Sequence, residues 1–303
     1  MHIWVFSYNR GVFLRNCIAS IEQCAPMCTV TVFDDASTDV ETLAVLAEVG
    51  KRHRVIQPQQ AQMTSKHGGL YGNMQVAFEQ TLDDDLMLFL QDDTQLVRPI
   101  DAQEIVELQQ YFIRHPDAAF VQPAFMRGCN EAKDRPLTRF DAAEGMYWVD
   151  RYNRSAGAFY SDICIANVQR LRSKGWRFAE REAANEQAAK KQFGQMAYLQ
   201  NPFAAWLPNV PAFRGKQQTW AMRRAQQVSG SGFFPITIMS SENTQQFKQR
   251  DPGLLPYAEQ FLSVSNGPIK QPWIYYPLQN KRWLKRISHV EVFLKTQFGR
   301  RTK

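Results

Sequence analysis

The sequence lacks any apolar run close to the roughly 20 residues that an α-helix needs to cross a bilayer. Its most apolar stretch, Leu86 to Leu90, is short and has aspartates on both sides. The first residues, Met1 to Phe6, contain no basic group ahead of an apolar core, so they predict a buried strand rather than a signal peptide. With 303 residues, 44% of them hydrophobic, the chain is also neither disordered nor fibrous in composition.

The sequence contains few cysteines, and their number is odd. The chain has five cysteines, and the pair Cys24 and Cys28 has no second pair or histidine cluster that would complete a zinc site. We therefore expect reduced, mostly packed thiols in a cytoplasmic protein.

The sequence has no excess of charge outside its C-terminal end. The net charge is +7, and residues 281–303 hold eight Lys or Arg and one Glu, which accounts for all of it. The balanced remainder argues against a nucleic-acid-binding surface. We expect no nucleic-acid partner.

Four short apolar runs alternate with segments of helical period, which is typical of a parallel, doubly wound sheet. The runs are residues 3–6, 30–33, 55–56 and 86–90. Further helices are predicted near 102–114 and 180–193, with antiparallel or mixed strands added from 118–125 and 156–165. The predicted fold is an α/β, Rossmann-like, doubly wound mixed sheet with a C-terminal helical extension.

Ligands of parallel sheets bind beyond the carboxyl ends of the strands, so the residues that follow each apolar run are examined first. Three runs end in clusters of polar residues: Ser7 to Arg10, Asp34 to Asp39, and Gln91 to Thr94. Carboxylates that converge at one edge can hold a divalent cation or accept hydrogen bonds from a base and ribose. Turn chemistry explains any single pair, but three such exits together favour a metal and diphosphate site.

These motifs, in this order, resemble the GT-A glycosyltransferases of family 2 over about residues 1–215. The resemblance implies a nucleoside diphosphate sugar donor, with Asp34 or Asp35 reading the base. The residues it assigns to donor binding are Ser7, Asn9, Arg10, Asp34, Asp35, Lys66, Asn73, Gln91, Asp92, Arg214 and Lys216.

The resemblance also implies a divalent cation, Mn²⁺ or Mg²⁺, at the acidic motif that ends the fourth apolar run. Gln91 stands where the family has its first acidic residue, so Asp93 is the predicted metal ligand. Arg214 and Lys216 lie where many relatives carry a metal-binding histidine. As phosphate-binding cations they could neutralise the leaving diphosphate, which leaves a metal-independent enzyme as an alternative.

For the general base, the family places a Glu-Asp pair at the start of a helix, and the nearest match here is Glu186 followed by Gln187. One carboxylate suffices to take a hydroxyl proton, so Glu186 is the predicted base. Glu180, Glu182 and Asp162 are rivals, and an ordinary solvent-facing Glu186 is the structural alternative.

Residues 281–303 predict a basic amphipathic helix with an apolar stripe formed by Trp283, Ile287, Val290, Leu294 and Phe298. Such a helix either binds an anionic membrane or packs on the core. The predicted domains are residues 1–220, for nucleotide sugar and acceptor, and residues 221–303, a lid or extension that ends in this helix. A membrane surface is thus a candidate partner, and the inner face of the membrane a candidate location.

The resemblance therefore implies an inverting glycosyltransferase of the hexosyltransferase class. It would move a sugar, with UDP as the expected nucleotide, to a hydroxyl of a glycan or lipid-linked glycan, as in polysaccharide biosynthesis. The alternative is a non-catalytic protein that binds a nucleotide sugar through a degenerate site, because Gln91 and Gln187 stand at family acidic positions.

Overall fold

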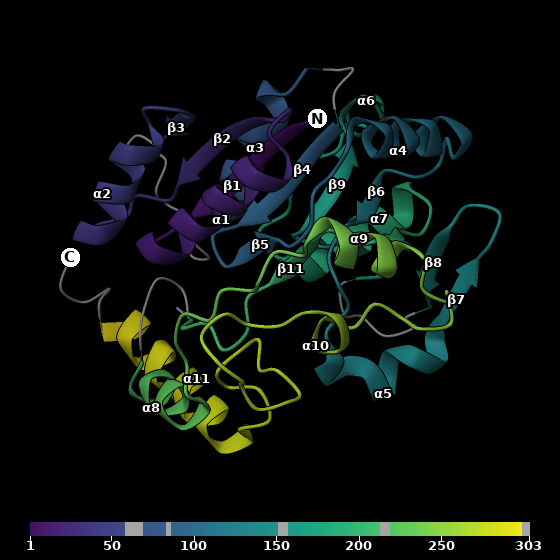
Figure 1. Ribbon diagram of the computed structural model, residues 1–303. Coiled ribbons are helices and arrows are strands. Elements are labelled where there is room, and N and C mark those ends of the chain that lie inside the picture. The colour runs from purple at the N-terminus through teal and green to yellow at the C-terminus, as the bar shows by residue number, and fades with distance from the viewer. Residues whose placement is uncertain (58–68, 83–85, 151–156, 213–218, 299–303) are drawn as a thin grey trace.

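A computed structural model describes residues 1–57, 69–82, 86–150, 157–212 and 219–298 (Figure 1). Its centre is a nine-stranded sheet in the order β3-β2-β1-β4-β9-β6-β10-β8-β7. The first half contains β1 (His2–Ser7), β2 (Thr29–Asp34), β3 (Arg54–Ile56) and β4 (Leu86–Gln91). All pairings within this half are parallel, as the alternating sequence pattern predicts.

The second half of the sheet is mixed. It comprises β6 (Phe120–Gln122), β7 (Thr138–Asp141), β8 (Met146–Val149), β9 (Cys164–Asn167) and β10 (Ala197–Leu199). Strand β9 runs antiparallel to both β4 and β6, while β10 runs parallel to β6. The predicted doubly wound mixed α/β sheet is therefore confirmed, although the run 118–125 forms only the short strand β6.

Helices cover both faces of the sheet because alternate strand residues point to opposite sides. Ile3 and Val5 of β1 pack with α1 (Gly11–Cys24), α2 (Val40–Val49) and α4 (Ala102–Arg114). Trp4 and Phe6 pack on the other side. That side is covered by α3 (Leu70–Gln80), α6 (Val168–Ser173) and α7 (Glu182–Gln192).

Local signals explain where several helices begin. Asp39 caps α2 by accepting a hydrogen bond from the backbone of Thr42, as its sequence position predicts. Asp101 and Glu104 form a capping box at the start of α4. The cysteines in the described residues are free thiols, and Cys17, Cys24 and Cys164 are buried.

Several short elements link the sheet to the last third of the chain. Strand β5 (Thr94–Leu96) pairs with β11 (Ala204–Trp206). Helix α5 (Glu131–Asp134) lies between two 3-10 turns, Gly128–Asn130 and Arg135–Leu137. The C-terminal helices are α8 (Trp220–Ser229), α9 (Ser241–Lys248), α10 (Ala258–Phe261) and α11 (Arg282–Phe298). The predicted helical extension is thus present. Among the described residues, no helix combines the length and the apolar character needed to span a membrane.

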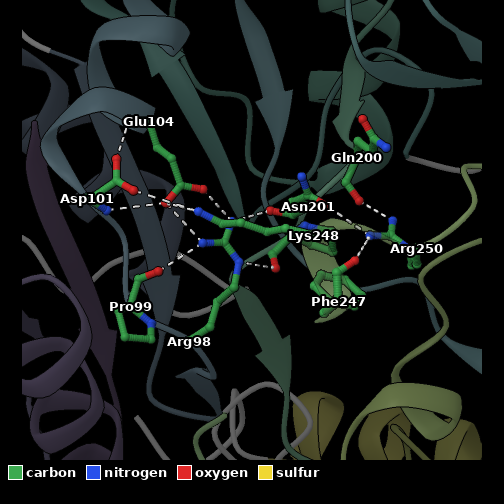
Figure 2. Close-up of polar contacts among 10 residues, drawn as sticks. Arg98, Pro99, Asp101, Glu104, Gln200, Asn201, Phe247, Lys248 and Arg250 are labelled. Carbon is green, nitrogen blue, oxygen red and sulfur yellow. Dashed lines mark hydrogen bonds and ion pairs between the residues drawn. The ribbon is translucent and has the colours of Figure 1, made fainter. Parts of the chain in front are cut away.

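Lys248, in α9, and Arg250, in the loop after it, connect this segment to the main sheet domain next to the buried Arg98 (Figure 2). Lys248 Nζ lies 3.2 Å from the Glu104 carboxylate. The Arg98 guanidinium donates to both carboxylate oxygens of Glu104, at 2.7 and 3.0 Å. Arg250 donates to the Asn201 side chain at 2.8 Å and to the backbone oxygen of Gln200. Since Phe125 and Leu207 also share an apolar cluster with Phe247 and Trp273, residues beyond 220 pack into the core of the first part. The predicted role of 221–303 as a lid stays a prediction.

Candidate functional site

The carboxyl ends of β1 and β4 lie side by side and enclose a cavity of about 140 Å³. In the strand order β3-β2-β1-β4, the chain winds away from β1 in both directions. Ligands of open α/β sheets bind at such a switch point. The cavity is lined by Phe6, Ser7, Tyr8, Arg10, Asp35, Leu70, Asn73, Gln91 and Asp92. Six of the residues predicted to bind the donor are therefore gathered around one hollow.

An ion-pair cluster forms one wall of this cavity. The Arg10 Nη1 atom lies 3.0 Å from Asp92 Oδ1 and 2.7 Å from Asp93 Oδ2. The other oxygen of Asp92 accepts the backbone N–H of Tyr8 at 3.0 Å. Burial raises the pKa of Asp92 to about 6, against the lowering effect of Arg10. Asp92 and Asp93 thus hold the Arg10 guanidinium at the exit of β1, beside the cavity.

Asp34 and Asp35 have different surroundings. Asp34 is fully buried and accepts hydrogen bonds from the backbone N–H and the hydroxyl of Ser37, at 2.8 and 2.5 Å. Asp34 therefore shapes the turn, because Ser37 engages both of its oxygens, and it does not line the cavity. Asp35 lines the cavity and accepts the backbone N–H of Gly69 at 2.8 Å. Of the two predicted base readers, the structure places Asp35 at the cavity.

Asn9 does not line the cavity and instead stabilises the loop beside it. It adopts a positive φ of 48°, which asparagine tolerates better than most residues. Its side-chain oxygen accepts the backbone N–H groups of Thr38 and Asp39, at 2.8 and 3.1 Å. Asn9 thereby joins the loop after β1 to the loop after β2, and it acts on the cavity through that loop.

A glycine and an asparagine at the start of α3 complete the cavity. A Cβ atom added to Gly69 would meet Asp35 Oδ1 at 2.2 Å, so the close approach requires glycine. Asn73 is 6% exposed, and its Nδ2 atom has no hydrogen-bond partner among the described residues. A buried amide without a partner fits a ligand oxygen. The predicted donor residues Lys66, Arg214 and Lys216 lie outside the described residues.

The sequence reasoning missed three lining residues, Phe6, Tyr8 and Leu70, of which Tyr8 has the polar group. It stands between Ser7 and Asn9, which are predicted from the same loop, and it lines the cavity. Burial and the nearby charges of Asp35 and Asp34 raise the pKa of its phenol. An aromatic ring in this loop can stack on a base. Its position within an already selected motif was the available signal.

Described residues contain no group of three or more His, Cys, Asp or Glu side chains arranged to hold a metal. Asp93 still offers one suitable atom, because its Oδ1 is buried and has no hydrogen-bond partner in the described part of the chain. Mg²⁺ is often bound by one or two carboxylates together with substrate phosphates. Asp93 therefore fits a cation that binds together with a diphosphate, and the metal prediction stays a prediction.

Glu186, the predicted general base, lies in surroundings that do not suit that role. It is 2% exposed and accepts backbone N–H groups of four consecutive residues, Gly157, Ala158, Phe159 and Tyr160, at 2.8 to 3.3 Å. A carboxylate that satisfies four buried donors holds the chain in place, and taking up a proton would break those bonds. We therefore do not retain Glu186 as the base.

Asp162, one of the rival carboxylates, differs from Glu186 in having a buried oxygen, Oδ1, with no hydrogen-bond partner in the described ranges. Its Oδ2 accepts the Tyr71 hydroxyl at 3.0 Å. Burial and the nearby Glu182 charge raise the pKa of Asp162 well above its usual value. Strand β9 pairs Cys164 with Phe89, and continuing that antiparallel register by two residues places Asp162 opposite Gln91. Asp162 thus lies at the sheet edge that holds the cavity.

No family model matches the sequence, and no curated protein matches it. The fold is similar to solved structures of glycosyltransferases. One is TarS 1-349 from S. aureus, with 16% identity, a TM-score of 0.48 and coverage of 68% of this chain and 60% of that one. Another is the mannosyltransferase PcManGT from Pyrobaculum calidifontis in complex with GDP-Man and Mn²⁺, with 12% identity, a TM-score of 0.47 and coverage of 85% and 67%.

A third is the galactosyltransferase LgtC with donor and acceptor sugar analogues, at 15% identity and a TM-score of 0.34, covering 64% of this chain and 67% of that one. The matched region spans only 60% of the TarS 1-349 chain.

Proposed function

We propose that this protein is a glycosyltransferase that uses a nucleoside diphosphate sugar, with a UDP-sugar as the first candidate donor. The acceptor is a hydroxyl of a glycan or a lipid-linked glycan. One observation carries the proposal: the cavity at the β1–β4 switch point has a fixed cation, Arg10, on one side and the hydrogen-bonding groups of Asp35 and Asn73 on the other. This combination suits a phosphate group joined to a base and ribose.

In this proposal six of the lining residues have a definite part. Asp35 and Tyr8 receive the base, and Asn73 and Gln91 hydrogen-bond ribose or sugar hydroxyls. Arg10 draws the diphosphate toward the exit of β1, and Asp92 keeps the guanidinium in position. A divalent cation at Asp93 would neutralise charge on the departing diphosphate. Lys66, Arg214 and Lys216 keep their predicted roles as further phosphate contacts.

Asp162 takes the role first predicted for Glu186. In a single displacement, the acceptor oxygen bonds to the anomeric carbon while the bond from that carbon to the diphosphate oxygen breaks. The diphosphate leaves with the electron pair, and the acceptor proton passes to the Asp162 carboxylate. A carboxyl whose pKa is raised above that of an ordinary aspartate is, once ionised, a stronger base for this proton. Direct displacement inverts the anomeric configuration.

The second candidate, a non-catalytic protein that binds nucleotide sugars, is favoured by one observation. Glu186 is fully engaged by backbone donors, and the next residue, Gln187, has no carboxylate. In this candidate function the protein binds a nucleotide sugar and does not cleave it.

Nucleotide release from a panel of nucleoside diphosphate sugars separates the two candidates. The assay is run with Mn²⁺, with a mixture of glycan acceptors, and with Asp162→Asn as the matched variant. We expect one donor to be consumed by the native protein and to be bound but not consumed by Asp162→Asn. Binding without turnover in both proteins would support the second candidate. Failure of every donor to bind would overturn both.

A further inference from the structure

The helix α11 is fixed to α8 along one side. Leu284 and Ser288 are 3% and 0% exposed and face α8, and Ile287 packs against the same cluster. The Ser288 hydroxyl lies 3.0 Å from that of Thr219, the capping residue of α8. The Glu291 carboxylate accepts the backbone N–H groups of Trp220 and Ala221 at 2.9 and 3.0 Å. The two helices thus form one rigid pair at the edge of the molecule (Figure 1).

This packing corrects the predicted apolar stripe. Ile287 belongs to the buried side, while Trp283, Val290 and Leu294 remain exposed at 61%, 57% and 45%. At about 100° per residue these three positions fall close together on the helix. Phe293, at 61% exposure, adjoins them, and Trp220 at the start of α8 is 52% exposed. Together these five side chains are here called the apolar ridge.

The charged groups around the apolar ridge have one sign. Arg282, Lys285 and Arg286 are exposed on α11, and Arg223 and Arg224 are exposed on α8. At about 100° per residue, Arg282 and Arg286 lie beside Phe293, whereas Lys285 lies on the side of Phe293 that faces away from Trp283. Glu291 is the one acidic residue within 219–229 and 281–294, and its carboxylate caps the start of α8. Cations flanking exposed aromatic and aliphatic side chains complement an anionic, partly apolar surface. A bilayer containing anionic lipids has both properties.

The α8–α11 pair is also connected to the candidate site by short links. The backbone N–H of Leu207 donates to the backbone oxygen of Asp93 at 2.8 Å. Two residues on, the Asn209 N–H donates to the backbone oxygen of Ile274, and its side chain donates to the backbone oxygen of Ser229, the last residue of α8. A surface bound to the helix pair would therefore lie near the segment that leads away from Asp93.

We propose that the apolar ridge and its flanking cations bind the surface of a bilayer that contains anionic lipids. Trp283 and Phe293 enter the boundary between headgroups and acyl chains, and the arginines and lysines contact lipid phosphates. Membrane binding does not depend on the proposed donor or reaction. Where both proposals hold, the bound enzyme meets a lipid-linked acceptor at the surface.

Sedimentation with vesicles tests the proposal on the full chain. Vesicles of phosphatidylcholine alone are compared with vesicles that also contain phosphatidylglycerol. We expect binding to the anionic vesicles only. The paired change Trp283→Ser and Phe293→Ser should abolish it, and Lys285→Glu with Arg286→Glu should weaken it by tenfold or more, because each basic residue contributes about 1 kcal/mol.

The control is Ile113→Ser, which removes an apolar side chain that is 68% exposed on α4, away from the ridge. This variant should bind vesicles like the native protein. Native circular dichroism in the ridge variants confirms that they fold. Equal binding to neutral vesicles, or unchanged binding by the ridge variants, would overturn the proposal. So would a native dimer that Trp283→Ser and Phe293→Ser convert to monomers, since a second copy would then cover the ridge.

Discussion

Two buried carboxylates on the same side of the sheet, those of Glu186 and Asp162, have opposite surroundings. Glu186 accepts four backbone N–H groups, whereas Asp162 accepts the Tyr71 hydroxyl and has one oxygen without a partner in the described residues. The four donors fix the Glu186 side chain and the backbone of residues 157–160 around it. Burial, one oxygen without a hydrogen-bond partner in the described residues and the neighbouring Glu182 raise the pKa of Asp162 and leave a carboxyl that can exchange a proton. Burial alone therefore does not distinguish an anchoring carboxylate from a reactive one; the hydrogen-bond partners do.

The largest expected effect is on turnover by Asp162→Asn. Because the amide cannot take the acceptor proton, the rate should fall about 10²- to 10⁴-fold while nucleotide affinity stays within a few-fold of native. Nucleotide release under saturating donor measures the rate, and calorimetry measures the affinity. Glu182→Gln serves as the control for the neighbouring charge and should lose less. A native rate in Asp162→Asn would remove the distinction between the two carboxylates.

The converse change, Glu186→Ala, should act on stability. It leaves the four backbone N–H groups of residues 157–160 buried without an acceptor, which costs about 3 kcal/mol or more. Urea unfolding measures this loss. Gln187→Ala, at the exposed next position, should change stability by no more than about 0.5 kcal/mol. If Glu186→Ala has the same urea midpoint of unfolding as the native protein but no turnover, the anchoring role is wrong.

The pH dependence sharpens the same comparison. Asp162 is surrounded by Tyr71, Tyr160, Cys164 and Glu182, and burial together with Glu182 raises its pKa. Turnover needs the carboxylate, so it should fall as pH drops through that raised value, well above the range of an ordinary aspartate.

Stability should have the opposite slope in that window. The folded protein holds a proton on Asp162 at pH values where the unfolded chain has lost it, so the free energy of unfolding falls as pH rises. Asp162→Asn should flatten this part of the curve. A pH–stability curve identical in the native protein and the variant would show that Asp162 titrates normally.

The smallest effect concerns Asp35, a third carboxylate that is held by one backbone N–H. Gly69→Ala forces a Cβ atom against Asp35 Oδ1 and should weaken nucleotide binding with a strain of about 1–3 kcal/mol. Gly72→Ala on the same helix meets nothing within 4 Å and is the matched control. Calorimetric titration of both variants measures the difference. Equal affinities would place the nucleotide away from Asp35.

The first half of the sheet could be predicted because its evidence is local. Each strand from β1 to β4 is a short apolar run, and each exit of β1, β2 and β4 carries its polar residues directly after the run. Parallel pairing then brings those exits to one edge. Fold class and most of the cavity lining follow from these two facts.

The roles of individual carboxylates could not be predicted, because they depend on partners far along the chain. The donors to Glu186 are 26 to 29 positions away, and Tyr71 is 91 positions from Asp162. In the same way, helical period placed Ile287 on the apolar stripe of α11 but could not show that α8 covers it. The buried hydrogen bond from Arg250 to the Asn201 side chain also escaped prediction, since the two residues are 49 positions apart.

The most direct test is a calorimetric titration of nucleoside diphosphates, UDP first, with and without Mn²⁺, on the native protein and on Asp93→Ala. The account predicts that one nucleotide binds the native protein, that Mn²⁺ strengthens the binding, and that Asp93→Ala removes this strengthening. Absence of binding by every nucleotide, with and without the metal, would contradict the assignment of the β1–β4 cavity as a nucleotide site.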